Sequence, residues 1–259
     1  MAKVIAVTNQ KGGVGKTTTS VNLAASLAVA EQRVLVVDID PQGNATMGLG
    51  YDKKAQETTS YQVLMGELPI PEAILHPVED TQRAPDLIPS NSNLSGAEVE
   101  LVDQENRERR LRRALAEVHD DYDFILIDCP PSLNLLTVNA LVAAHSVLIP
   151  IQTEYYALEG LSQLMEVIQK IRRRSNPQLR IEGLLLTMFD NRNNLANQVS
   201  EEVRSHFGRK VYETVIPRNV RLGEAPSYGM PVVHYDALCR GSRSYMDLAN
   251  EIMELGVPA

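Results

Sequence analysis

A glycine-rich segment near the amino end of the chain carries residue types that bind phosphate. It runs from Lys11 to Thr18 and reads KGGVGKTT. Glycines let the backbone turn tightly so that successive N–H groups point inward, and the amino end of a following helix adds positive potential there. The Lys16 ammonium would then reach the β- and γ-phosphates of a nucleotide, while the Thr17 hydroxyl would bind Mg²⁺. The spacing therefore predicts a nucleotide-phosphate site at residues 11–18.

The front of this segment departs from the usual phosphate-loop pattern. In G-x-x-x-x-G-K-[ST] the first glycine would fall on Gln10, and a second lysine, Lys11, opens the loop instead. Two cations on one small loop repel each other, and Lys16 already serves the phosphates. Within a single chain Lys11 is therefore redundant.

Aspartates end two of the apolar runs of the sequence. Asp128 ends FILI, where a carboxylate can bind Mg²⁺ or cap the segment after Pro130. Asp38 and Asp40 end VLVVDID. A phosphoryl-transfer enzyme needs groups that position a water and neutralise phosphate charge, and two carboxylates at strand ends suit that task. Acidic residues after strands are common, so spacing alone leaves the role of Asp40 open.

The elements that must position these residues follow the rhythm of a parallel sheet. Runs such as VIAVT and FILID are apolar nearly throughout, as expected for strands covered by helices on both faces. We predict strands at residues 3–9, 33–40, 124–128, 146–151, 181–189 and 211–216. Helical spacing of apolar residues predicts helices at 17–30, 111–118, 160–174, 198–207 and 244–255. The expected fold is three-layered α/β, with a mostly parallel twisted sheet and residues 1–259 in a single domain.

The bulk composition narrows the function classes. Hydrophobic residues make up 44% of 259, enough for a substantial core. The formal charge of −8 excludes a chain coated in positive charge, so any DNA contact must be a local patch. No apolar stretch approaches the ~20 residues that span a bilayer, and no secretion signal is visible. The two cysteines fit a reducing compartment, so we expect a cytoplasmic protein without a membrane partner.

Five segments together give the chain a resemblance that covers nearly its whole length. They are KGGVGKTT at 11–18, VDIDPQGNAT at 37–46, LIDCPPSL at 126–133, EYYALEGL at 154–161 and IPRNVRLGEAPSYG at 216–229. With these motifs the chain resembles the deviant Walker A ATPases, and within them the ParA/Soj chromosome- and plasmid-partitioning proteins. The resemblance implies a P-loop NTPase fold and slow hydrolysis of ATP with Mg²⁺. No helix-turn-helix precedes Lys3, so we do not expect the operator-binding autoregulation of the longer plasmid relatives.

The resemblance implies roles for individual residues of the nucleotide site. Lys11, Lys16 and Asp40 would be catalytic, with Asp40 orienting the water and Asp38 structural. Mg²⁺ would be held by Thr17, Asp40 and Asp128. The nucleotide would be bound by Lys11, Gly12, Gly13, Val14, Gly15, Lys16, Thr17, Thr18, Pro217 and Asn219. Adenine is implied too, since no guanine-reading N-K-x-D motif occurs, and the base would lie near residues 188–190 and 217–219.

The resemblance also implies partners. Lys11 would cross to the ATP of a second subunit, so that ATP joins a sandwich homodimer. Arg192 and Arg221 would belong to a patch that binds double-stranded DNA without sequence preference and places the ATP form on the nucleoid. Tyr155 and Tyr156 would line the dimer face or simply pack. A ParB/Spo0J-like DNA-bound protein would stimulate hydrolysis.

Three alternatives share part of this pattern. A MinD-like membrane switch needs a carboxy-terminal amphipathic helix with a basic face, whereas residues 244–255 carry acidic residues and no Lys or Arg. A reductase of the nitrogenase iron-protein type needs two cysteines per subunit at a shared axis, and the placement of Cys129 and Cys239 does not suit that. A binding module with a dead nucleotide site conflicts with the intact Lys16, Thr17, Asp40 and Asp128.

Overall fold

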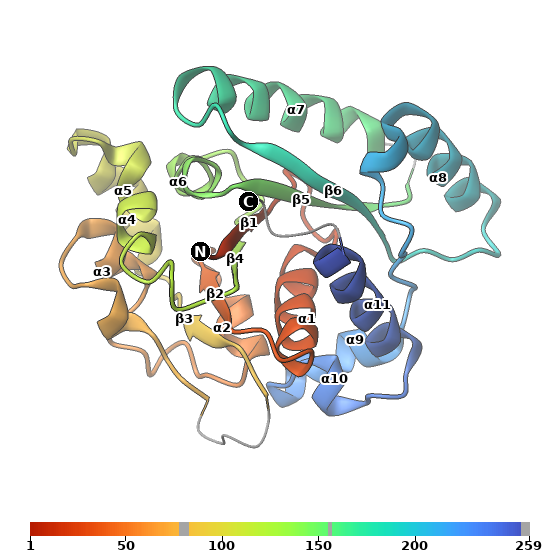
Figure 1. Cartoon of the computed structure of the whole chain (residues 1–259), viewed down its shortest axis with the longest axis horizontal. Coiled ribbons are helices and arrows are strands. Elements are labelled where there is room, and N and C mark those ends of the chain that lie inside the picture. Colours follow the sequence, from red (N-terminus) through yellow and green to blue (C-terminus); the bar gives the residue numbers. More distant parts are fainter. Residues whose placement is uncertain (78–82, 155–156, 255–259) are drawn as a thin grey trace.

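The core of the molecule is a parallel sheet of six strands in the order β3-β2-β4-β1-β5-β6 (Figure 1). The computed structural model describes residues 1–77, 83–154 and 157–254. The strands are β1 (Lys3–Val7), β2 (Val34–Asp38), β3 (Asp86–Ile88), β4 (Phe124–Asp128), β5 (Ser146–Gln152) and β6 (Arg180–Thr187). Every residue of β1, β2 and β4 is buried, as their apolar runs predict for strands covered on both faces. The predicted α/β class with a parallel central sheet is confirmed.

Helices cover both faces of this sheet (Figure 1). They are α1 (Lys16–Val29), α2 (Asn44–Gly48), α3 (Ser60–Met65), α4 (Leu94–Glu100), α5 (Arg110–Leu115), α6 (Leu135–Ala143), α7 (Ala157–Arg174), α8 (Asn194–Phe207), α9 (Val220–Glu224), α10 (Val232–Tyr235) and α11 (Arg240–Glu254). Apolar residues of α6, α7 and α8 form one buried cluster with Val4 and Ala6 of β1. Residues of α1 and α11 form the other with Ile5 and Val7. Successive side chains of β1 thus point into opposite layers.

The register brings three functional segments to one edge of the sheet. Val7 at the end of β1 and Asp38 at the end of β2 are both paired with Asp128 at the end of β4. The carboxyl ends of β1, β2 and β4 therefore lie level with one another. The glycine-rich loop leaves from the first of these ends, and Asp40 follows the second.

The predicted strand at residues 211–216 is wrong. Val211 makes only an isolated parallel bridge with Leu184 of β6. The N–H groups of Tyr212 and Ile216 still donate to carbonyl oxygens of β6, at 3.0 and 2.9 Å. Between them, the N–H groups of Glu213 and Thr214 donate to the carboxylate of Glu251 on α11, at 2.8 and 3.0 Å, so the ladder is interrupted.

Strand β3 and the helices α2, α3, α4, α6, α9 and α10 were not predicted, and β3 and α6 show why. Strand β3 has only three residues and lies between Pro85 and Pro89. Helix α6 is apolar on most of its circumference and buried between α5, α7 and the sheet, so it shows no amphipathic period from which a helix could be recognised. Predicted helix ends differ by a few residues elsewhere, and Tyr155, Tyr156 and Leu255 lie outside the described residues.

Candidate functional site

The loop between β1 and α1 has the backbone shape that a phosphate site needs. Gly13 and Gly15 have φ angles of 74° and 86°, a left-handed conformation that costs glycine little because it has no Cβ. Thr187, at the end of β6, donates its hydroxyl to the carbonyl oxygen of Val14 at 2.8 Å. Val14 is 1% exposed. The loop is therefore anchored to the sheet from β6 as well as from β1.

Lys16 is a buried cation at the base of this loop. It is the first residue of α1, is 7% exposed, and donates from Nζ to the carbonyl oxygen of Lys11 at 3.0 Å. Burial lowers the pKa of the Lys16 ammonium, and the nearby carboxylates of Asp128 and Asp40 oppose that shift. An anion bound in the loop would add a further compensating charge. The position suits a phosphate group.

Asp128 closes β4 directly below the start of α1. Its Oδ2 accepts a hydrogen bond from the Thr17 hydroxyl at 2.8 Å, and its Oδ1 accepts one from the Ser20 hydroxyl at 2.8 Å. Burial, and then the charge of Asp38, raises the pKa of this carboxyl to about 8. A hydroxyl and a carboxylate in contact are oxygen ligands of the kind that Mg²⁺ prefers, and a divalent cation would remove the cost of the buried charge. These residues therefore fit Mg²⁺.

Asp38 and Asp40 differ in how fully their oxygens are used. Asp38 is fully buried and accepts from the backbone N–H groups of Asp40 and Thr46 and from the Thr46 hydroxyl, which ties β2 to α2. Asp40 is 7% exposed, and its Oδ1 accepts from the Gln42 N–H at 2.9 Å. Asp40 thus keeps an oxygen available for a water in the site, whereas both oxygens of Asp38 are engaged.

Lys11 faces away from the pocket that Lys16 occupies. Its Nζ contacts Oε2 of Glu154, just past β5, at 2.6 Å, and the two side chains are 39% and 50% exposed. Its backbone N–H donates to Asn9 Oδ1, and Asn9 Nδ2 donates to the Pro150 carbonyl oxygen. Lys11 is therefore held at the surface by two links to β5. Sequence reasoning found neither Asn9 nor Glu154, because both links join residues more than 140 positions apart.

A hollow of about 210 Å³ beside the loop brings Pro217 and Asn219 to the phosphate site. Gly15 and Thr18 line one side of it, and the turn after β6 lines another. The Tyr245 ring from α11 closes the hollow, with its hydroxyl 3.2 Å from Thr19 Oγ1. The hollow adjoins the loop, as a nucleobase would.

The two arginines of the predicted DNA patch lie on the surface, and each is ion-paired. Arg192 is 87% exposed and contacts Asp190 at 2.8 Å. Arg221, on α9, contacts Glu224 at 2.7 Å and Asp236 at 3.3 Å.

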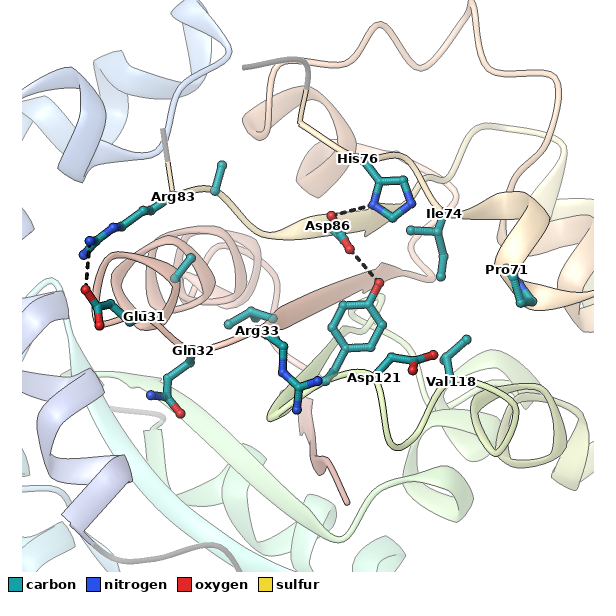
Figure 2. A pocket seen from close by; sticks show the side chains of 14 residues that line it. Glu31, Gln32, Arg33, Pro71, Ile74, His76, Arg83, Asp86, Val118 and Asp121 are labelled. Atoms are coloured by element: carbon teal, nitrogen blue, oxygen red, sulfur yellow. Dashed lines mark hydrogen bonds and ion pairs between the residues drawn. The ribbon is translucent and has the colours of Figure 1, made fainter. Parts of the chain in front are cut away.

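Figure 2 shows another hollow, of about 620 Å³, that is not the nucleotide site. It lies at the amino ends of β2 and β3, the edge of the sheet opposite the loop. Asp86 in its wall accepts from the Tyr122 hydroxyl at 2.6 Å and contacts His76 at 2.9 Å, while Arg83 pairs with Glu31. Most of the charge lining this hollow is thus neutralised within the chain.

Neither cysteine is fully exposed in the structure. Cys129 is 0% exposed below Asp128, and burial raises the pKa of its thiol well above the usual range. Cys239 is half-buried next to α11, where its Sγ accepts from the Ser242 N–H. Among the residues that the structure describes, no helix combines the length and apolarity that a bilayer crossing needs.

Known proteins similar to this chain are P-loop proteins. A family model described as AAA domain matches residues 2–181. Chromosome partitioning protein ParA of Myxococcus xanthus is 55% identical, with 100% of this chain and 90% of that protein covered. Sporulation initiation inhibitor protein Soj of Bacillus subtilis is 56% identical, with 99% and 100% covered. The crystal structure of a cobyrinic acid a,c-diamide synthase from Mycobacterium smegmatis, with bound ADP and magnesium, has a TM-score of 0.85 at 35% identity, covering 98% of this chain and 95% of its own.

Proposed function

Because this chain belongs to the ParA/Soj family of P-loop partitioning ATPases, we propose that it is a Mg²⁺-dependent ATPase whose nucleotide state controls assembly on DNA. The observation that carries the proposal is the meeting of Lys16, Thr17 and Asp128 beneath a loop with left-handed glycines. Relatives named for chromosome partitioning support chromosome or plasmid segregation as the process.

In this proposal the chain's own groups prepare the phosphate for attack. The N–H groups of residues 12–18 and the Lys16 ammonium bind the phosphate oxygens. Thr17 and Asp128 would hold Mg²⁺, which when bound would neutralise negative charge on the phosphate oxygens. Asp40, with one oxygen still available, also approaches the metal site and orients the attacking water. Pro217 and Asn219 contact the adenine.

The second lysine supports an ATP-dependent sandwich dimer. Lys11 lies outside the Lys16 pocket and is 39% exposed, so its ammonium can reach a nucleotide held by a second subunit. A bound triphosphate would then attract a cation from each chain, and hydrolysis would weaken that attraction. The dimer would present Arg192 and Arg221 to DNA, and a ParB/Spo0J-like partner would accelerate hydrolysis and release.

The proposal is tested by calorimetry and light scattering on the whole chain. Wild type should bind ATP with Mg²⁺ and form a dimer, and Asp40→Ala should do both while hydrolysing ATP far more slowly. Lys16→Ala should abolish ATP binding, whereas Lys11→Ala should bind ATP and stay monomeric. An Asp40→Ala protein that remains monomeric in saturating ATP and Mg²⁺ would refute the dimer, and wild type without Mg²⁺-dependent ATP binding would refute the whole proposal.

A MinD-like membrane cycle is the second candidate. The chain gives it little support, because after Arg243 helix α11 carries Asp247, Glu251 and Glu254 and no basic residue. Pelleting with anionic vesicles in the presence of ATP separates the two. We expect the protein to stay in the supernatant.

A further inference from the structure

A surface hollow of about 640 Å³ gathers positive charge that the chain does not neutralise. It lies between the turn after β6, the segment before α9 and the start of α11. Four arginines line it, Arg192, Arg218, Arg240 and Arg243, together with a single carboxylate, Asp190. We call this the arginine hollow.

The charge balance of the arginine hollow is strongly one-sided. Asp190 is already used by Arg192, which donates to both of its oxygens, and this lowers the pKa of Asp190 to about 2. The ion pairs found among the described residues include none with Arg218, Arg240 or Arg243. The chain as a whole has a net charge of −8, so a local cluster of unpaired arginines is unusual for it and indicates a binding site. An anionic partner supplies one, since it would relieve the repulsion between the arginines.

Helix α11 adds to the same potential. Its 15 residues begin at Arg240, and Ser244 in its first turns also lines the hollow. The amino end of a helix presents N–H groups and a partial positive charge to an anion. Guanidinium groups bind phosphate oxygens through pairs of parallel hydrogen bonds. Both features favour a phosphate group as the ligand of the arginine hollow.

The arginine hollow also shares a wall with the hollow beside the phosphate loop. Pro217 and Arg218 line both. This wall is fastened to the turn after β6, because the Phe189 N–H donates to the Ile216 carbonyl oxygen at 3.0 Å and the Arg218 N–H donates to that of Phe189 at 3.2 Å. An occupant of either hollow therefore contacts the same short segment.

We propose that the arginine hollow binds the phosphodiester backbone of DNA, with Arg240 and Arg243 of α11 as phosphate-binding residues beside Arg192 and Arg218. Asp190 is an internal competitor, because it engages two of the Arg192 donors that a DNA phosphate could otherwise use. This inference rests on the proposed DNA binding, and it names the surface and the residues that bind the DNA phosphates. It adds to Arg221, which Glu224 and Asp236 already engage.

The test measures the anisotropy of a fluorescent DNA duplex titrated with protein, ATP and Mg²⁺ at several salt concentrations. All proteins carry Asp40→Ala so that hydrolysis does not end the titration. Each phosphate contact contributes about 0.9 to the slope of log affinity against log salt. The double variant Arg240→Ala, Arg243→Ala should lower that slope by about 1.8 per subunit and weaken binding at low salt. The matched control is Arg172→Ala, Arg173→Ala, which removes two exposed arginines from the last turn of α7.

Asp190→Asn gives an opposite, gain-of-function readout. Removing the competing carboxylate should strengthen DNA binding several-fold, because it frees two donors of Arg192 and removes the negative charge from the hollow; unchanged binding would refute the competition. Unchanged ATP affinity and melting temperature show that each variant is folded. No DNA binding by the parent protein in any nucleotide state would overturn the proposed function itself. Binding by the parent with equal slopes for the α11 variant and the α7 control would overturn this inference alone.

Discussion

Replacing Glu154 by Gln should tighten the ATP-dependent dimer. In the structure Lys11 Nζ lies 2.6 Å from Glu154 Oε2, and the dimer proposed here requires that ammonium to leave for the partner's nucleotide. Glutamine keeps the size of the side chain and removes its charge. The variant therefore removes an interaction of the monomer that dimerisation has to break.

The expected size follows from the exposure of the pair. With side chains 39% and 50% exposed, the pair is screened by solvent, and such pairs contribute about 0.2–1 kcal/mol. A symmetric dimer breaks one pair in each subunit, so the total is about 0.4–2 kcal/mol. At about 1.4 kcal/mol per factor of ten, the dimer dissociation constant should fall about 2- to 30-fold.

Sedimentation velocity over a range of protein concentrations, with ATP and Mg²⁺ and in the Asp40→Ala background, measures this constant. The effect should shrink as salt is raised, because salt screens exposed charges. Glu166→Gln is the matched control, since Glu166 is an exposed carboxylate on α7 with no ion pair among those found in the described residues. A Glu154→Gln dimer that is no tighter than this control at low salt would show that Glu154 does not restrain Lys11.

Three further variants probe the scaffold of the site. Gly183→Ala should destabilise the fold by about 1–3 kcal/mol, because its Cβ would lie 2.4 Å from the Tyr212 ring, and urea unfolding measures the loss. Ser20→Ala should lower the affinity for Mg²⁺ in ATP binding about 10–100-fold, because Asp128 Oδ1 loses its donor, and calorimetry at graded Mg²⁺ detects this. Burial lowers the pKa of His145, so the folded state favours the neutral imidazole ring. The stability that this residue contributes is therefore fully present above about pH 6.5, the pKa of an unfolded histidine, and is lost as the pH falls below that value. Urea unfolding between pH 8 and 5 should therefore depend less on pH in His145→Gln.

Matched controls separate these effects from general damage. Gly223→Ala places its Cβ in open space and should leave stability nearly unchanged. Ser26→Ala removes a hydroxyl from the same helix as Ser20, one without a hydrogen-bond partner, and should leave Mg²⁺ dependence intact. His206→Gln makes the same substitution at an exposed histidine and is the control for His145→Gln. If any test variant behaves as its control does, the contact assigned to it is unimportant.

Local patterns predicted the parts of the fold that local physics determines. Apolar runs identified five of the six strands of the described sheet, because strands covered on both faces are apolar along most of their length. The same reasoning failed at residues 211–216, where a β-branched run lost its ladder to the carboxylate of Glu251, and at α6, where burial on most sides removed the helical period. Both failures come from neighbours distant in the sequence.

The sequence by itself determined the phosphate loop, the lysine at its base and the aspartates at strand ends, because residue types and short spacing carry that chemistry. Only the tertiary structure decided which side chains interact. It engages both oxygens of Asp38 in hydrogen bonds while leaving an oxygen of Asp40 available, and it pairs Glu154 with Lys11. It also gathers arginines from three separate segments around one hollow. Charges interact through space over a few ångströms, and those separations exist only once the sheet has brought remote segments together.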